Sequence, residues 1–138
     1  LSHNVLSNSK MKTLIISLFL ILITSSNVQA FYKTEKFMSD FHSAIEKDEK
    51  GKQEYLLNYL QGIVEGVITS NVLSMFENDK RLFCPPPKVT FDARRVLLLL
   101  PNFMVQAQFG ETKWKEISGD DPLALIVPQL LIHTYPCN

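Results

Sequence analysis

Apolar residues recur at helical spacing along much of the chain. Between residues 31 and 50, Phe37, Phe41 and Ile45 are four residues apart, and charged residues occupy much of the opposite face. This spacing is typical of an amphipathic helix, because it gathers apolar side chains on one face. The polar run that follows ends in Gly51, which is predicted to stop the first helix or to act as a hinge.

A longer helix is predicted over residues 52–78. Gly62 and Gly66 lie one turn apart on it, and each glycine costs a helix about 1 kcal/mol relative to alanine. We therefore expect another helix to approach closely there, rather than a ligand. The apolar stripe of this helix includes Leu56, Leu60, Ile63 and Val67.

The stretch FCPPPKVT interrupts the helical pattern. Three prolines after Cys84 cannot continue a helix and predict an extended corner. The next helix is expected to begin with Thr90 as its N-cap. Residues 96–100 are apolar all round and predict a buried centre for this helix, which Pro101 should kink or divide.

The segment QFGETKWKEISGDD, residues 108–121, lacks a long apolar run and predicts a loop with room for one helical turn. Asp121 and Pro122 are expected to cap and start the last helix, which Pro136 ends. Alternation typical of strands is absent. The sequence therefore predicts an all-α fold, a compact single-domain bundle of four to five helices.

The stretch from Met11 to Ala30 resembles a secretory leader. Lys12 precedes an apolar core at residues 14–23, and Val28-Gln29-Ala30 has the pattern of a signal-peptidase site. The apolar core is shorter than the roughly 20 residues that a membrane span needs. We expect residues 1–10 to be upstream sequence, residues 11–30 to be cleaved off, and residues 31–138 to form an exported domain with no membrane attachment.

Charge and cysteine content argue against three roles: nucleic-acid binding, metal binding and thiol chemistry. Residues 1–30 hold only two of the 14 basic residues and none of the 14 acidic ones, so the mature domain is slightly acidic, which argues against nucleic-acid binding. In an oxidising compartment the only two cysteines, Cys84 and Cys137, are expected to form a disulfide that stabilises the fold by about 4 kcal/mol. The alternatives are weaker. A metal site would need both His42 and His133, and a reactive thiol would need a nearby base.

No catalytic, phosphate-binding or metal-binding motif is present, so we expect no enzyme activity and no cofactor. Binding is the remaining role, and Trp114 lies in a charged segment away from the leucine stripes. A tryptophan there fits either an interface anchor or a lid folded onto the core, and both readings stay open. The charged turn at residues 77–81 is a second, weaker candidate. The predicted partner-binding residues are Lys113, Trp114, Lys115, Glu116, Ser118, Gly119 and Asp120.

The order of the motifs LQGIVEGV (60–67), FCPPPKVT (83–90) and the C-terminal YPC resembles the small periplasmic immunity proteins of type VI secretion systems, the Tai and Rap proteins. The resemblance implies a helical, often homodimeric protein that occludes the active-site cleft of a cognate peptidoglycan amidase with a protruding loop. It also implies that Cys84 and Cys137 are paired. The chain differs from some relatives in having Leu60 where they have cysteine.

Two other functions are open on the sequence. The first is an acid-stress chaperone of the HdeA type, which is also small, helical, exported and disulfide-bonded, and which exposes apolar surface when its carboxylates are protonated. The second is a structural subunit of an envelope complex. A chaperone should protect many clients in acid, whereas an immunity protein should bind one partner at neutral pH.

Overall fold

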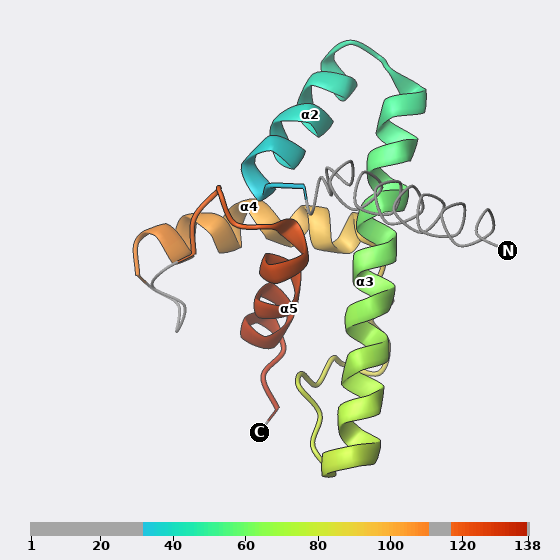
Figure 1. The fold of residues 1–138 in the computed structure, drawn as a ribbon, viewed down its shortest axis with the longest axis vertical. Coiled ribbons are helices and arrows are strands. Elements are labelled where there is room, and N and C mark those ends of the chain that lie inside the picture. Colours follow the sequence, from blue (N-terminus) through green and yellow to red (C-terminus); the bar gives the residue numbers. More distant parts are fainter. Residues whose placement is uncertain (1–31, 111–116, 138) are drawn as a thin grey trace, which may run out of the picture. The chain divides into compact units, whose positions relative to one another are not determined.

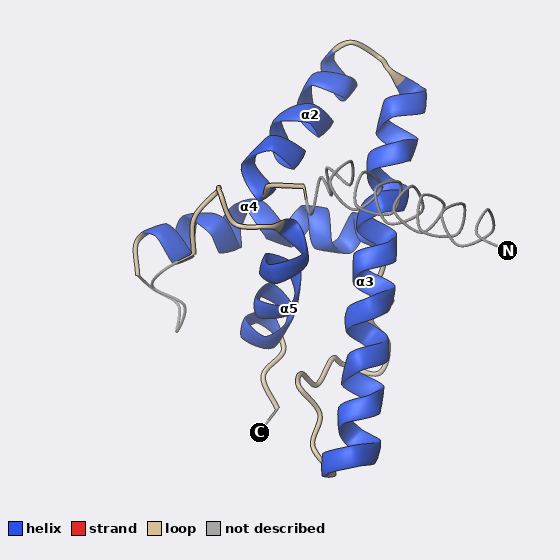
Figure 2. Cartoon of the chain, in the orientation of Figure 1, coloured by secondary structure: helices blue, strands red, loops and turns tan. Residues whose placement is uncertain are grey.

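A computed structural model describes residues 32–110 and 117–137, which belong to one structural unit, Phe31–Asn138. These residues form helices α2 (Thr34–Glu46), α3 (Lys50–Asn78), α4 (Ala93–Gln108) and α5 (Leu123–Thr134) and contain no strand (Figures 1 and 2). The all-α prediction is confirmed. None of the described helices is long and apolar enough to cross a membrane.

Helices α2 and α3 form an antiparallel hairpin joined by a short turn (Figure 1). Asp48 makes this turn in the left-handed conformation, with φ of 53°, which aspartate tolerates better than most residues. The Glu49 N–H then donates to the Ala44 carbonyl at 2.9 Å. Gly51 lies inside α3, so the prediction that it ends the first helix is wrong.

Helix α5 is the centre of the core. It contacts each of the other three helices. Phe83, from the corner after α3, is also buried in this core. The stripe predicted for α3 is confirmed except that Val64, not Ile63, joins its fully buried positions. The fully buried residues of α5 are Leu123, Ile126, Val127, Leu130 and Leu131.

Helix α4 differs from its prediction at its N-cap and in the burial of residues 96–100, and of the two effects expected of Pro101, a kink or a division, the division does not occur. Asp92, not Thr90, is its N-cap, because the Asp92 side chain accepts a hydrogen bond from the Arg95 N–H at 2.8 Å. Pro101 does not divide the helix, which continues to Gln108. The run at residues 96–100 is not buried all round, since Leu98 is 76% exposed and lies between the buried residues Val96 and Leu100.

Gly62 and Gly66 of α3 face open space. A Cβ built at Gly62 or Gly66 would meet no atom within 4 Å, and both residues are exposed. The expectation that another helix of this domain approaches them is therefore wrong.

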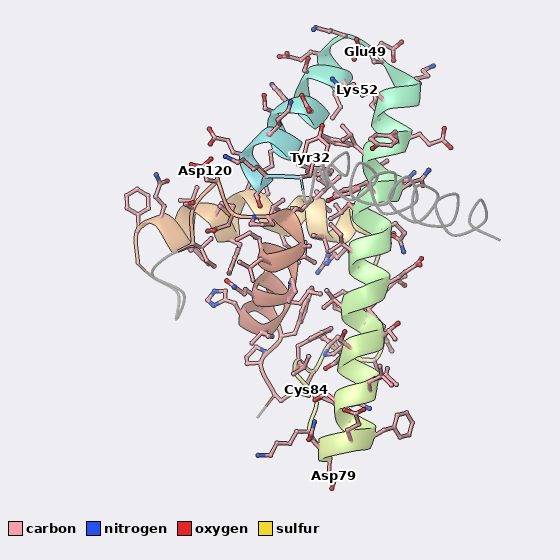
Figure 3. All side chains as sticks on the ribbon, viewed as in Figure 1. Tyr32, Glu49, Lys52, Asp79, Cys84 and Asp120 are labelled. Atoms are coloured by element: carbon pink, nitrogen blue, oxygen red, sulfur yellow. A yellow bond between two sulfur atoms is a disulfide. The ribbon has the colours of Figure 1, made fainter. Side chains whose placement is uncertain are left out.

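The corner after α3 is fixed by the predicted disulfide, which joins Cys84 to Cys137. In addition, the Cys84 N–H donates to the Tyr135 carbonyl at 2.8 Å. Figure 3 shows Cys84 beside the last turns of α3. The C-terminal tail is thus attached to the corner both covalently and by the backbone.

Candidate functional site

The predicted binding segment lies only partly within the described residues. Lys113, Trp114, Lys115 and Glu116 fall outside them, so both readings of Trp114 remain untested. Ser118, Gly119 and Asp120 are described, and they lie in the connection between α4 and α5.

Residues 117–121 are held against the first turn of α2. The Thr34 N–H donates to the Asp121 carbonyl at 3.0 Å, and the Glu35 N–H donates to the Gly119 carbonyl at 2.9 Å. The Thr34 hydroxyl also donates to the Asp121 carbonyl, at 2.9 Å. The first N–H groups of a helix have no partner within the helix, so this segment supplies partners that α2 needs.

The same residues form a tight turn among themselves. The Asp121 carboxylate accepts from the Ser118 N–H at 2.8 Å, so it closes this turn instead of capping α5, and the residue before α5 is Pro122. The Ser118 hydroxyl accepts from the Asp120 N–H at 3.2 Å. A Cβ at Gly119 would lie 2.9 Å from the Cβ of Glu35, so only glycine fits without displacing the neighbouring helix.

Asp120 presents a charge at this turn. Its carboxylate pairs with the Lys33 ammonium at 2.8 Å, and both side chains are mostly exposed (Figure 3). The hydrogen bond and charge of Lys33 lower the pKa of Asp120, and the same contact raises the pKa of Lys33. Exposed ion pairs stabilise a fold little. The pair therefore matters more as a polar feature that a partner would meet.

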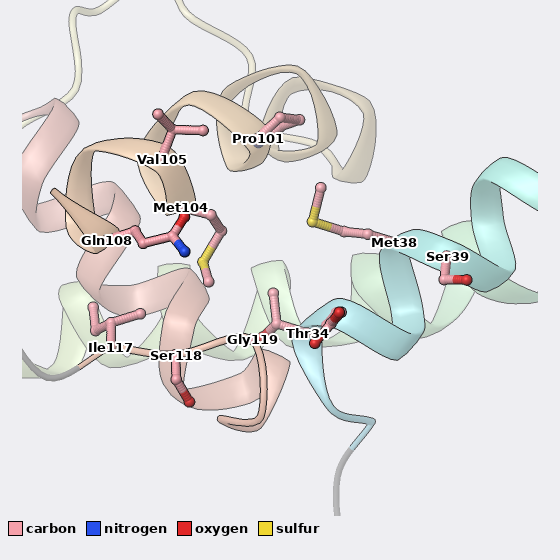
Figure 4. Close-up of a pocket in the computed structure, with 11 residues that line it drawn as sticks. Thr34, Met38, Ser39, Pro101, Met104, Val105, Gln108, Ile117, Ser118 and Gly119 are labelled. Carbon is pink, nitrogen blue, oxygen red and sulfur yellow. The ribbon is translucent and has the colours of Figure 1, made fainter.

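A cleft of about 610 Å³ lies beside the turn, between α2, α4 and residues 117–119 (Figure 4). Met38 reaches from α2 toward α4, and Met104 reaches from α4 toward the 117–119 segment. Ser118 and Gly119, two of the predicted residues, line this cleft. The full lining is Thr34, Glu35, Met38, Ser39, Pro101, Met104, Val105, Gln108, Ile117, Ser118 and Gly119.

The chemistry of the cleft is that of a binding surface. Its lining combines apolar side chains, among them two flexible methionines that adapt to irregular surfaces, with hydroxyl and amide groups. Glu35 is the one ionisable residue of the lining. A mainly apolar hollow with a few polar groups is usual for a recognition site. Within residues 32–110 and 117–137, no cluster of three or more His, Cys, Asp or Glu residues is arranged to hold a metal ion.

The two histidines considered from the sequence lie on different helices. The His42 ring lies 3.2 Å from the Glu46 carboxylate on α2. The His133 ring lies 3.3 Å from the Gln106 side chain and packs against Phe103 with a centroid separation of 5.6 Å. Each histidine has a local partner, and they share none.

Sequence reasoning missed Asn71, a buried polar residue on α3. Its side-chain oxygen accepts from the N–H groups of Leu82 and Phe83, at 2.7 and 3.1 Å, and its amide donates to the Phe83 carbonyl at 3.0 Å. The signal was present, because Asn71 lies four residues after Val67, in the line of the apolar stripe. It holds the segment that carries Cys84 against α3.

Comparison with known proteins finds no match for this chain among family models, curated proteins or solved structures.

Proposed function

We propose that the protein is an exported immunity protein that binds a peptidoglycan amidase delivered by type VI secretion and occludes the active-site cleft of that enzyme. The observation that carries the proposal is the turn at residues 118–121, which is fixed to α2 by backbone hydrogen bonds and borders an open cleft. The motif order LQGIVEGV, FCPPPKVT and YPC supplies the class of partner.

A fixed turn suits an inhibitor for an energetic reason. A partner that binds a loop already held in its bound conformation does not have to order that loop, so more of the contact energy appears as affinity. The hydrogen bonds to Thr34 and Glu35 provide this order at Ser118, Gly119 and Asp120. The disulfide supports the proposed periplasmic location, since disulfides persist in oxidising compartments.

The contacts proposed for the amidase divide by chemistry. Trp114 supplies an apolar anchor, which is the residue type most enriched among interface hot spots. Asp120 and Lys33 supply charged rim contacts, which influence the rate of association more than the affinity.

A competition assay tests this function. Cells that lack the gene should lose viability beside a sister strain that delivers the amidase, and the wild-type gene should restore it. The Trp114→Ala variant should restore viability less well, with unchanged helicity by circular dichroism. Equal survival with and without the gene would contradict the proposal and favour the chaperone or the structural subunit.

We also propose that the protein forms a homodimer through the exposed outer face of α3. Gly62, Gly66, Leu73 and Phe76 lie on this face at helical spacing, and Phe76 is 82% exposed. Lys52 and Glu77 lie at opposite ends of the helix, so an antiparallel second copy brings opposite charges together. The absence of a Cβ at the two glycines lets the two backbones approach closely.

A further inference from the structure

A second hollow adjoins the cleft. Its volume is about 490 Å³, and it lies between α2, α4 and Leu57 of α3. Met38 and Pro101 line both hollows, so the two meet where these side chains lie. The lining of the second hollow is Met38, Phe41, His42, Ile45, Leu57, Arg94, Leu97, Leu98, Leu100 and Pro101.

The two hollows lie along one face of α4, on either side of Met38 and Pro101, and we call them together the α2–α4 groove. Arg94, Leu98, Pro101, Val105 and Gln108 occupy one face of this helix at intervals of three or four residues. No Cα atom of α2 lies within 8 Å of a Cα atom of α4. The two hollows lie between these helices, and apolar side chains such as the exposed Leu98 border them.

Unpaired charges mark the two ends of the groove. Glu35 lines the end near Gln108, and Arg94 lines the end near Ile45. Among the described residues neither side chain has an ion-pair partner. Two ion pairs lie nearby, Lys33 with Asp120 and His42 with Glu46. Three further charged residues line a hollow together with Arg94: Lys50, Glu54 and Asp92.

An α-helix has the complementary charge distribution. Its N-terminus carries a partial positive charge and its C-terminus a partial negative charge. A helix lying in the groove with its N-terminus near Glu35 and its C-terminus near Arg94 would meet an opposite charge at each end. Apolar grooves of this kind bind the apolar face of amphipathic helices.

We infer that the α2–α4 groove binds an amphipathic helix of a partner protein in this orientation. The α4 face from Arg94 to Gln108 spans 14 residue steps, or about 21 Å at 1.5 Å per residue, which corresponds to about four helical turns. The inference is linked to the proposed function at one point: the partner whose helix occupies the groove would also contact the neighbouring turn at residues 118–120. It does not require the partner to be an amidase.

The methionines provide a direct readout. Met38 and Met104 line the groove, whereas Met75 lies on the distant part of α3 and serves as an internal reference. The probe is a synthetic 14-residue peptide held helical by a covalent i,i+4 side-chain staple, as is its charge-exchanged control, with leucines on one face, lysines in its first turn and glutamates in its last. In a titration followed by methionine-methyl NMR, the signals of Met38 and Met104 should shift and that of Met75 should not.

Two controls make the test specific. Leu98→Glu should weaken peptide binding about tenfold or more, whereas Leu125→Glu, at an exposed leucine of α5 outside the groove, should not. A peptide with the lysines and glutamates exchanged should bind about fivefold more weakly. Unshifted Met38 and Met104 signals, equal shifts at Met75, or Leu98→Glu binding at wild-type affinity would each overturn the inference. Peptide binding without amidase inhibition would support the groove and contradict the proposed function.

Discussion

At the scale of single residues, Asn71 is the polar group on which the corner after α3 depends. Its side chain is buried and bonds to backbone groups of Leu82 and Phe83. Removing one partner from a buried hydrogen bond leaves the other group unsatisfied, which costs more than the bond itself contributes. Removing the Asn71 side chain therefore leaves unsatisfied the Leu82 and Phe83 backbone groups that position Cys84.

We predict that Asn71→Ala lowers the free energy of unfolding by about 2–4 kcal/mol, because three backbone groups, two of them in buried hydrogen bonds, lose their partner. Urea denaturation of the oxidised protein measures this. Asn58→Ala, at an exposed position of the same helix, is the matched control and should change stability little. Equal midpoints for both variants would show that Asn71 does not hold the corner.

The Tyr32–Asp40 hydrogen bond predicts a dependence of stability on pH. Desolvation by burial, followed by the bond to Asp40, raises the pKa of Tyr32 to about 12. Hydrogen bonds from Tyr32 and then Lys36 lower the pKa of Asp40. The raised tyrosine pKa means that the contribution of Tyr32 is complete below about pH 10 and is lost toward pH 12. The lowered carboxyl pKa means that the contribution of Asp40 is complete above the usual carboxyl range and is lost only below it.

We therefore expect Tyr32→Phe to remove the ionisation near pH 12 from the ultraviolet tyrosine titration. The variant should also lose part of the stability difference between neutral pH and strong acid, because the Asp40 carboxylate loses a donor. A titration curve with an unchanged high-pH limb would contradict this assignment.

At the scale of elements, α3 carries two glycines with no neighbour that needs them. In an exposed helix interior, alanine is more stable than glycine by about 1 kcal/mol per site. If the outer face binds a second copy, however, each added Cβ separates the two backbones. Stability and association should therefore change in opposite directions.

The double variant Gly62→Ala/Gly66→Ala should raise the free energy of unfolding of the monomer by about 2 kcal/mol. Sedimentation equilibrium should show weaker self-association than for the wild type. Gly119→Ala is the contrasting control and should destabilise the fold, because its Cβ would collide with Glu35. Unchanged or stronger dimerisation of the double variant would place the homodimer interface elsewhere.

The elements show which features the sequence could predict. Helical spacing identified all four described helices and most of the core of α3 and α5, because their apolar faces are nearly continuous. Two predictions from short sequence motifs were wrong because another residue has the expected role. Asp48, not Gly51, forms the turn after α2, and Asp92, not Thr90, is the N-cap of α4. The cleft could not be predicted, because it depends on how α2 and α4 are positioned by α3 and α5, which contact both of them.

At the scale of the whole molecule, the disulfide closes the second half of the domain into a loop, because its two cysteines are 53 residues apart in sequence. Such a link stabilises mainly by restricting the unfolded chain. The double variant Cys84→Ser/Cys137→Ser should lose about 4 kcal/mol of unfolding free energy. The bond from the Cys84 N–H to Tyr135 and the bonds of Asn71 remain, so circular dichroism should still show a helical fold. A variant as stable as the oxidised wild type would contradict a stabilising role.

We propose that this helical scaffold inhibits a peptidoglycan amidase. We would measure the cleavage of purified peptidoglycan by the proposed cognate amidase, as the protein is titrated into the reaction. We predict that activity falls to zero near one protein chain per enzyme, and that Trp114→Ala requires at least tenfold more protein. Full amidase activity in the presence of excess wild-type protein would contradict the account.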